Sequence, residues 1–236
     1  MQTALLDNVA HANLRLRRGA GAELGDPAGQ VGIFLAEIPQ VQREYPILFA
    51  RDEGGRASPM AILGLTPNEV LFARDGHWDA RYLPALMRKG PFLLGKSDAD
   101  DPIVHVICDH PRVTQTGCDS DSDPLFLPHG GYAPALEDAL DALRIIHSGL
   151  APTEQFGQAL DELGLIQPLS FDVQLSDTSA VRFDNFHGIL PEAVASLSAE
   201  QLNGLNSAGF LHSAILIAHS LGNMNDLVRR KRMREG

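Results

Sequence analysis

Residues 102–111, with the sequence PIVHVICDHP, bring together four side chains of the kinds that bind metals: His105, Cys108, Asp109 and His110. Imidazole, thiolate and carboxylate groups are the usual protein ligands of zinc and iron. The apolar residues between them, however, predict a β-strand, in which successive side chains point to opposite faces. His105 and Asp109 would then share one face at roughly 13 Å along the strand. The four groups can meet at one ion only if the strand bends.

Two interpretations of this segment are open. Pro111 ends the predicted strand, so Asp109 and His110 are expected near a turn, where His110 could approach His129 of the LPHGG segment. An iron- or zinc-dependent enzyme using some of His105, Asp109, His110 and His129 is therefore one alternative. The simpler prediction is a strand whose polar groups lie at its ends, with no cofactor.

A second candidate site surrounds the single tryptophan, in the sequence DGHWDARY. Asp75 and Gly76 favour a tight turn, which would project Trp78 among charged neighbours. An aromatic side chain flanked by charge can bind a ligand or a protein partner. The candidate binding residues here are His77, Trp78, Asp79, Arg81 and Tyr82. Alternatively, Asp79 caps the short helix that follows, and Trp78 packs in the core.

The third candidate is a set of polar residues near the C-terminus. His212 and His219 lie seven residues apart in a predicted helix, a separation of roughly 11 Å over two turns. Pairs of histidines that bind a metal from one helix are spaced by about three or four residues instead. Together with Asn223, the two histidines suggest a polar stripe that faces a partner. The alternative is that they are partly buried and hydrogen bonded.

The overall charge argues against nucleic acid as a partner. The formal net charge is −11, and an acidic protein repels nucleic acids and anionic lipids. A basic cluster stands out at residues 229–234. Cations at the end of a helix complement its dipole, which is the simplest explanation of this cluster, and an anion site is the alternative. The motifs of serine hydrolases, dinucleotide-binding folds, P-loop proteins and zinc proteases are not present.

Cysteine content and hydropathy indicate a reduced, cytoplasmic setting. The two cysteines, Cys108 and Cys118, are too few for a disulfide framework. The first residues contain neither a long apolar region nor a cleavage site of the secretory type. No apolar run reaches the roughly 18 residues that a membrane helix needs. We therefore expect a cytoplasmic protein without an integral membrane segment.

The order of predicted elements indicates an α+β fold, with an antiparallel, strand-rich N-terminal part and a helical C-terminal part that contains a hairpin. We expect one domain over residues 1–236, with possible sub-lobes at 1–131, mainly strands, and 132–236, mainly helices plus the hairpin. Short apolar runs bounded by turn residues predict strands at 29–37, 44–52, 57–65, 68–76, 91–95 and 102–109.

The C-terminal part begins with two predicted helices. The first, over residues 133–150, is amphipathic and is expected to stop at Gly149. Thr153 is placed to cap the second, over 151–165. Residues 169–175 and 180–190 predict a hairpin. Ser198 and Gln201 form a capping-box pattern, and a final helix is expected over 210–233.

The chain also resembles a known family. The segments QREYPILFARD, AILGL, DGHWDARYLPALMRKGPFLLG, LPHGG and AGFLHSAILIAHSLGNMNDLVRRK are similar to those of the SapC family of bacterial proteins. The resemblance runs from about residue 4 to residue 233. It implies a surface-layer or transport role through gene neighbourhood, and it implies neighbouring-gene partners such as flavin-dependent halogenase-like proteins. It carries over no set of catalytic residues.

These observations favour a non-catalytic accessory or binding protein that recognises a peptide, a protein or a small ligand. The lack of a complete catalytic constellation and the aromatic, histidine-bearing segment around Trp78 both support this hypothesis. The metal-dependent enzyme is the first alternative. A surface-layer or secretion component is the second. Self-association into an oligomer is compatible with each of them.

Overall fold

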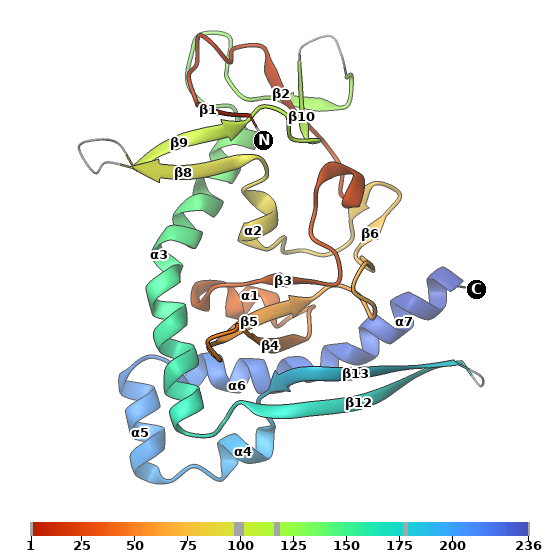
Figure 1. Cartoon of the computed structure of the whole chain (residues 1–236), viewed down its shortest axis with the longest axis vertical. Helices are drawn as coiled ribbons and strands as arrows, with labels where there is room; N and C mark the ends of the chain where they lie inside the picture. Colours follow the sequence, from red (N-terminus) through yellow and green to blue (C-terminus); the bar gives the residue numbers. More distant parts are fainter. Residues whose placement is uncertain (1, 97–101, 116–118, 177–178, 236) are drawn as a thin grey trace. The chain divides into compact units, whose positions relative to one another are not determined.

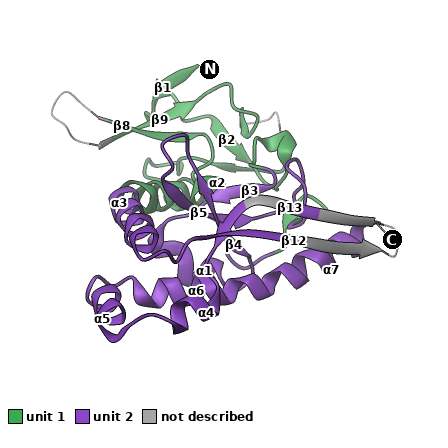
Figure 2. Cartoon of the chain, turned by 60° about the horizontal axis from the view of Figure 1, so that its bottom comes forward, with its two compact units in different colours: residues 1–27, 73–79, 85–147 green, residues 28–72, 80–84, 148–236 purple. Residues whose placement is uncertain are grey.

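The computed structural model describes residues 2–96, 102–115, 119–176 and 179–235. The chain forms two compact units, coloured separately in Figure 2. Unit 1 consists of Met1–Pro27, Ala73–Asp79 and Ala85–His147, and unit 2 of Ala28–Phe72, Ala80–Pro84 and Ser148–Gly236. The units alternate along the sequence, so neither corresponds to one continuous half of the chain.

Unit 1 is built from short antiparallel sheets. One sheet has the order β1-β9-β8 and another the order β10-β2-β11, and a two-stranded ribbon joins β6 to β7. The strands are β1 (Thr3–Leu5), β2 (Leu14–Arg17), β6 (Ala73–Arg74), β7 (His77–Trp78), β8 (Phe92–Lys96), β9 (Pro102–Ile107), β10 (Val113–Gln115) and β11 (Ser122–Pro124). The helical segments are η1 (Ala22–Leu24), α2 (Ala85–Arg88) and the first half of α3 (Pro134–Glu162).

The core of unit 1 lies between the β8–β9 pair and α3. Leu136, Ala139 and Leu143 recur along α3 at helical spacing and are buried against Phe92 of β8 and Val106 of β9. Leu14 and Leu16 of β2 pack on the same cluster. The alternation of β9 therefore buries Val106, as the sequence predicts for a half-buried strand.

Unit 2 is organised around a five-stranded antiparallel sheet with the order β12-β13-β4-β5-β3 (Figure 1). Its strands are β3 (Gln30–Gly32), β4 (Ile47–Arg51), β5 (Ala57–Ile62), β12 (Gln167–Ser176) and β13 (Ser179–Gly188). Its helices are η2 (Leu35–Glu37), α1 (Ile38–Val41), the second half of α3, α4 (Pro191–Ala195), α5 (Ala199–Ser207), α6 (Leu211–Ser220), η3 (Leu221–Asn223) and α7 (Met224–Glu235). Antiparallel sheets with several helices confirm the predicted α+β class.

Several local predictions for unit 2 are confirmed. The hairpin predicted from residues 169–175 and 180–190 is formed by β12 and β13. The capping box at the start of α5 is also present. The backbone N–H of Gln201 donates to the Ser198 hydroxyl at 3.2 Å, and the backbone N–H of Ser198 donates to the Gln201 side chain at 2.9 Å. Both features depend on residues close together in sequence.

The predicted helix stop at Gly149 is wrong, because α3 continues to Glu162. Gly149 instead allows close packing, since a Cβ atom there would lie 2.7 Å from the Cβ of Phe34. Thr153 does not cap a second helix. Its hydroxyl lies inside α3 and accepts a hydrogen bond of 2.9 Å from the backbone N–H of Leu35. Pro152 lacks a backbone N–H, and α3 accommodates it near the middle of its length.

Two further predictions need correction. The final helix is divided into α6 and α7 by η3, where the Asn223 side chain donates to the carbonyl oxygens of Gln42 at 2.7 Å and Tyr45 at 3.0 Å. The predicted strand at 68–76 is mostly a loop, in which Val70, Leu71 and Phe72 are buried and β6 is the only strand. Within this loop the backbone N–H of Leu71 donates to the Leu63 carbonyl at 2.8 Å. In the described parts of the chain, no helix is long and apolar enough to cross a membrane.

The packing at Gly149 gives a direct test of this part of the fold. Gly149→Ala should lower the free energy of unfolding by about 1–3 kcal/mol, because the new methyl group would overlap Phe34. Gly204 lies in α5 with open space around it, so Gly204→Ala should instead raise stability by about 0.5–1 kcal/mol. Guanidinium unfolding followed by circular dichroism would measure both. Equal stabilisation by the two substitutions would contradict the close contact.

Candidate functional site

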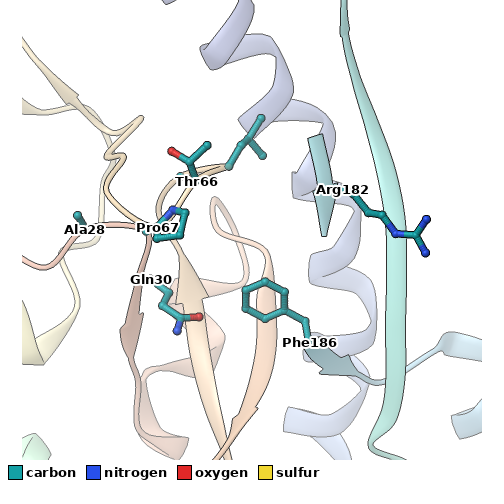
Figure 3. A pocket seen from close by; sticks show the side chains of 9 residues that line it. Ala28, Gln30, Thr66, Pro67, Arg182 and Phe186 are labelled. Carbon is teal, nitrogen blue, oxygen red and sulfur yellow. The ribbon is translucent and has the colours of Figure 1, made fainter. Parts of the chain in front are cut away.

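Unit 2 contains a pocket with a volume of about 300 Å³. It is bounded by the start of β3, by the loop that follows β5, and by β13 (Figure 3). The lining residues are Ala28, Gly29, Gln30, Gly64, Leu65, Thr66, Pro67, Arg182 and Phe186. This volume is at the lower end of the range for small-molecule sites, so the pocket fits a single small ligand or one side chain of a peptide.

One wall of the pocket is formed by two closely packed glycine segments. The backbone N–H groups of Leu63 and Gly64 both donate to the Gly29 carbonyl, at 2.8 and 3.1 Å. A Cβ atom on Gly29 would lie 2.6 Å from the Pro67 carbonyl oxygen, and Gly29 has a φ of +73°. A Cβ atom on Gly64 would lie 2.2 Å from the carbonyl oxygen of Glu69. Glycine is therefore required at both positions for this wall to close.

Glu69 holds this wall in place. One carboxylate oxygen accepts a hydrogen bond of 3.0 Å from the backbone N–H of Leu65, and the other pairs with Lys231 of α7 at 2.7 Å. The side chains of Lys231 and Glu69 are only 15% and 12% exposed. The Glu69 carbonyl also accepts a hydrogen bond of 2.8 Å from the backbone N–H of Gly29. One residue thus links β3, the pocket loop and α7.

The basic cluster at the C-terminus supports the same loop. The Arg234 guanidinium donates to the Val70 carbonyl at 2.7 Å, and the Arg230 guanidinium lies 4.5 Å from the centre of the Phe72 ring. With Lys231, these side chains give α7 a structural role within unit 2. The interaction of these cations with the helix dipole, which we predicted from the sequence, therefore explains only part of the role of the basic cluster.

The pocket interior combines an amide with an aromatic ring. Gln30 and Phe186 face the same space in Figure 3, whereas the Arg182 guanidinium extends away from Gln30. The side-chain oxygen of Gln30 is buried and has no hydrogen-bond partner among the described residues. A buried acceptor of this kind normally has a partner, so its position in a pocket indicates where a ligand or an ordered water would donate. Thr66 and Arg182 are exposed at the edge of the pocket.

Comparison with protein-family models gives a match over nearly the whole chain. The SapC family model matches residues 6–227. The chain belongs to the SapC family. No curated protein and no solved structure matches it. The assignment confirms the resemblance that the sequence segments indicate.

In this SapC-family chain, the residues of the predicted metal site have separate local roles. His105 lies in β9 opposite Leu93, and Asp109 accepts a hydrogen bond of 2.8 Å from the backbone N–H of Gln2, which lowers the pKa of its carboxyl group. His129 is exposed in a turn. Among the described residues, no group of three or more His, Cys, Asp or Glu side chains is arranged to hold a metal ion.

His110 lies in a positively charged setting in unit 1. Its Nδ1 atom accepts a hydrogen bond of 3.1 Å from the backbone N–H of Arg112, whose guanidinium pairs with Asp26 at 2.5 Å. Burial lowers the pKa of His110 below its ordinary value, and the charges of Arg112 and Lys89 lower it further. The hydrogen bond and the lowered pKa both favour the neutral imidazole.

The candidate residues around Trp78 are divided between the two units. Asp75 and Gly76 have positive φ angles of 52° and 76°, and they form the predicted tight turn between β6 and β7. His77, Trp78 and Asp79 belong to unit 1. The helix that follows begins only at Ala85, so the alternative in which Asp79 caps that helix is wrong.

Arg81 and Tyr82 belong instead to unit 2. The backbone N–H of Arg81 donates to the Glu44 carboxylate at 2.8 Å, and the Tyr82 hydroxyl donates to the buried Glu37 carboxylate at 2.9 Å. The Tyr45 hydroxyl donates to the Tyr82 carbonyl at 2.6 Å. These bonds fix residues 80–84 to unit 2. A ligand-binding role for the five candidates stays a prediction.

The C-terminal candidates also differ among themselves. His212 and His219 are exposed on α6, whereas Asn223 is half-buried and bonds to the Gln42 and Tyr45 carbonyls. A role of the two histidines in binding a partner stays a prediction, whereas Asn223 fixes the break between α6 and α7. Sequence patterns did not reveal the pocket, because Gln30, Thr66 and Phe186 come from distant segments. Gly29, at the start of the apolar run 29–37, and Gly64, near the end of the run 57–65, were the only local signal.

The neutral state of His110 leads to a pH-dependent prediction. Because its pKa is lowered in the folded state, the unfolded chain binds a proton first as the pH falls through about 6.5. Its contribution to stability is therefore complete above that pH and is lost as the pH falls toward the folded pKa. His110→Asn keeps an acceptor for the Arg112 N–H and removes the titration.

Unfolding in guanidinium at pH 7.5 and 5.0, followed by the fluorescence of Trp78 in unit 1, measures this difference. The natural protein should lose more stability between the two pH values than the His110→Asn variant does. Other titrating groups are common to both proteins and cancel in the comparison. An equal loss in the two proteins would show that His110 is not held neutral.

Proposed function

We propose that this SapC-family protein is a non-catalytic binding protein, and that the pocket of unit 2 receives a small ligand or a peptide side chain. The observation that supports this function is the buried oxygen of Gln30 in the pocket lining, which has no hydrogen-bond partner in the described part of the chain. Leaving a buried acceptor without a partner typically costs about 1–3 kcal/mol. A ligand that donates a hydrogen bond to Gln30 would remove this cost, and the gain would appear as affinity.

The rigidity of the walls supports the same proposal. Gly29, Gly64 and Glu69 are connected to one another and to the pocket loop by hydrogen bonds within the chain. Binding to a pocket that is formed in advance avoids the entropy cost of ordering a loop. The free energy of ligand contacts can therefore appear mainly as affinity.

The composition of the lining favours binding over catalysis. Among the described residues that line the pocket, there is no His, Asp, Glu, Lys or Cys side chain. Within this described lining, Thr66 carries the only hydroxyl group, and no lining residue there is a general base of the usual kinds that could activate it. The pocket provides a hydrogen-bonding amide, an aromatic surface and a guanidinium, which together suit recognition.

Benzamide is a suitable probe, because its carboxamide can donate to Gln30 while its ring contacts Phe186. Titration of the ¹⁵N-labelled full chain should shift the amide signals of Gln30, Thr66 and Phe186 together. The dissociation constant is expected in the millimolar range, equivalent to about 4 kcal/mol of binding free energy.

Two variants make this titration decisive. Gln30→Met preserves the size of the side chain but removes the amide, so it should weaken benzamide binding at least tenfold. Gln155 is exposed on α3 and does not line the pocket, so Gln155→Met should bind as the natural protein does. The proposal fails if saturating benzamide shifts no pocket signal, or if Gln30→Met binds it unchanged.

A further inference from the structure

The chemistry of the pocket narrows the class of ligand. We propose that it binds the edge of a nucleobase-type ring, which is a flat heterocycle carrying a hydrogen-bond donor next to an acceptor. This inference rests on the proposed binding function and specifies its ligand. The amide of Gln30, the ring of Phe186 and the position of Arg182 contribute three separate arguments.

The first argument is the geometry of the carboxamide. A glutamine side chain offers one acceptor oxygen and one donor nitrogen in the same plane. The same donor–acceptor pair allows glutamine to form two hydrogen bonds with adenine. The acceptor oxygen of Gln30 is buried, has no partner within the described ranges, and points toward Phe186 in Figure 3. A base edge with an N–H donor next to an acceptor would satisfy the amide completely.

The second argument is the aromatic surface. Phe186 lies in β13, and its neighbour His187 pairs with Phe49 of β4, so Phe186 belongs to the same sheet as Gln30. Nucleobases stack on aromatic side chains, and this stacking does not depend strongly on which base is present. A ligand that stacks on Phe186 and pairs with Gln30 needs a planar ring with polar edges. An aliphatic amide would use only the second of these contacts.

The third argument concerns size and charge. A pocket of about 300 Å³ accommodates one ring system and excludes a dinucleotide. Arg182 lies four residues before Phe186 in the same strand, which places it roughly 13 Å away along β13. The guanidinium is exposed and extends away from Gln30 (Figure 3), so it lies beyond the space that a ring between Gln30 and Phe186 would occupy. An anionic substituent, such as a phosphate, would have a counter-charge there.

Titration of the labelled full chain with adenosine and with uridine tests this inference. Methylated analogues that lack the donor, N6,N6-dimethyladenosine and 3-methyluridine, are the matched controls. We expect adenosine to shift the signals of Gln30 and Phe186, and the dimethyl analogue to bind at least tenfold more weakly. If uridine binds and its methylated analogue does not, the proposed ligand class is supported, and the ring is a pyrimidine. AMP should bind more tightly than adenosine, and Arg182→Gln should abolish that difference.

Other outcomes would overturn the proposal. They are that neither nucleoside shifts the pocket signals, that the methylated analogues bind as well as their parents, or that Gln30→Met retains nucleoside binding. Equal affinities for AMP and adenosine would remove the role of Arg182. If benzamide binds at the pocket while both nucleosides fail, the nucleobase inference alone is wrong. If benzamide also fails, the binding function is wrong with it.

Discussion

The pocket of unit 2 depends on the interactions of Glu69. Its carboxylate receives the Leu65 N–H and the Lys231 ammonium, while its carbonyl oxygen receives the Gly29 N–H. A carboxylate that is largely removed from water must be paired, and here its partners come from a loop and from the last helix. Removal of either partner would leave a half-buried charge. This requirement fixes the loop and therefore the shape of the pocket.

A rigid wall has a consequence for Gln30. Gly29 and Gly64 are packed too closely against the loop for any side chain, and the loop offers Gln30 no donor in this arrangement. The buried acceptor oxygen has no partner among the described residues, so a ligand in the pocket could supply the donor. The fold tolerates a locally unfavourable group at the place where an aromatic ring and an amide line the pocket. Such a conflict between local stability and overall fold is expected at a functional site.

Local patterns predicted what depends on neighbours in sequence. The Asp75–Gly76 turn, the β12–β13 hairpin and the Ser198 capping box follow from residue types a few positions apart. Features set by distant partners were missed. The sequence around Gly149 predicts a helix stop, but the structure packs Phe34 against this glycine within a continuous helix. The C-terminal basic cluster predicts a helix end, but in the structure Lys231 pairs with the distant Glu69. Gln30 and Phe186, which are joined only by the fold, gave no signal.

The most direct test of the account is the stability of Gln30→Met without ligand. If the Gln30 oxygen is buried without a partner, its replacement by an apolar group of similar shape should raise the free energy of unfolding by about 1 kcal/mol. Gln155→Met on the exposed face of α3 should change it by less than about 0.5 kcal/mol. Guanidinium unfolding monitored by circular dichroism measures both. A Gln30→Met variant less stable than the natural protein would show that Gln30 already has its partner, and would contradict the account.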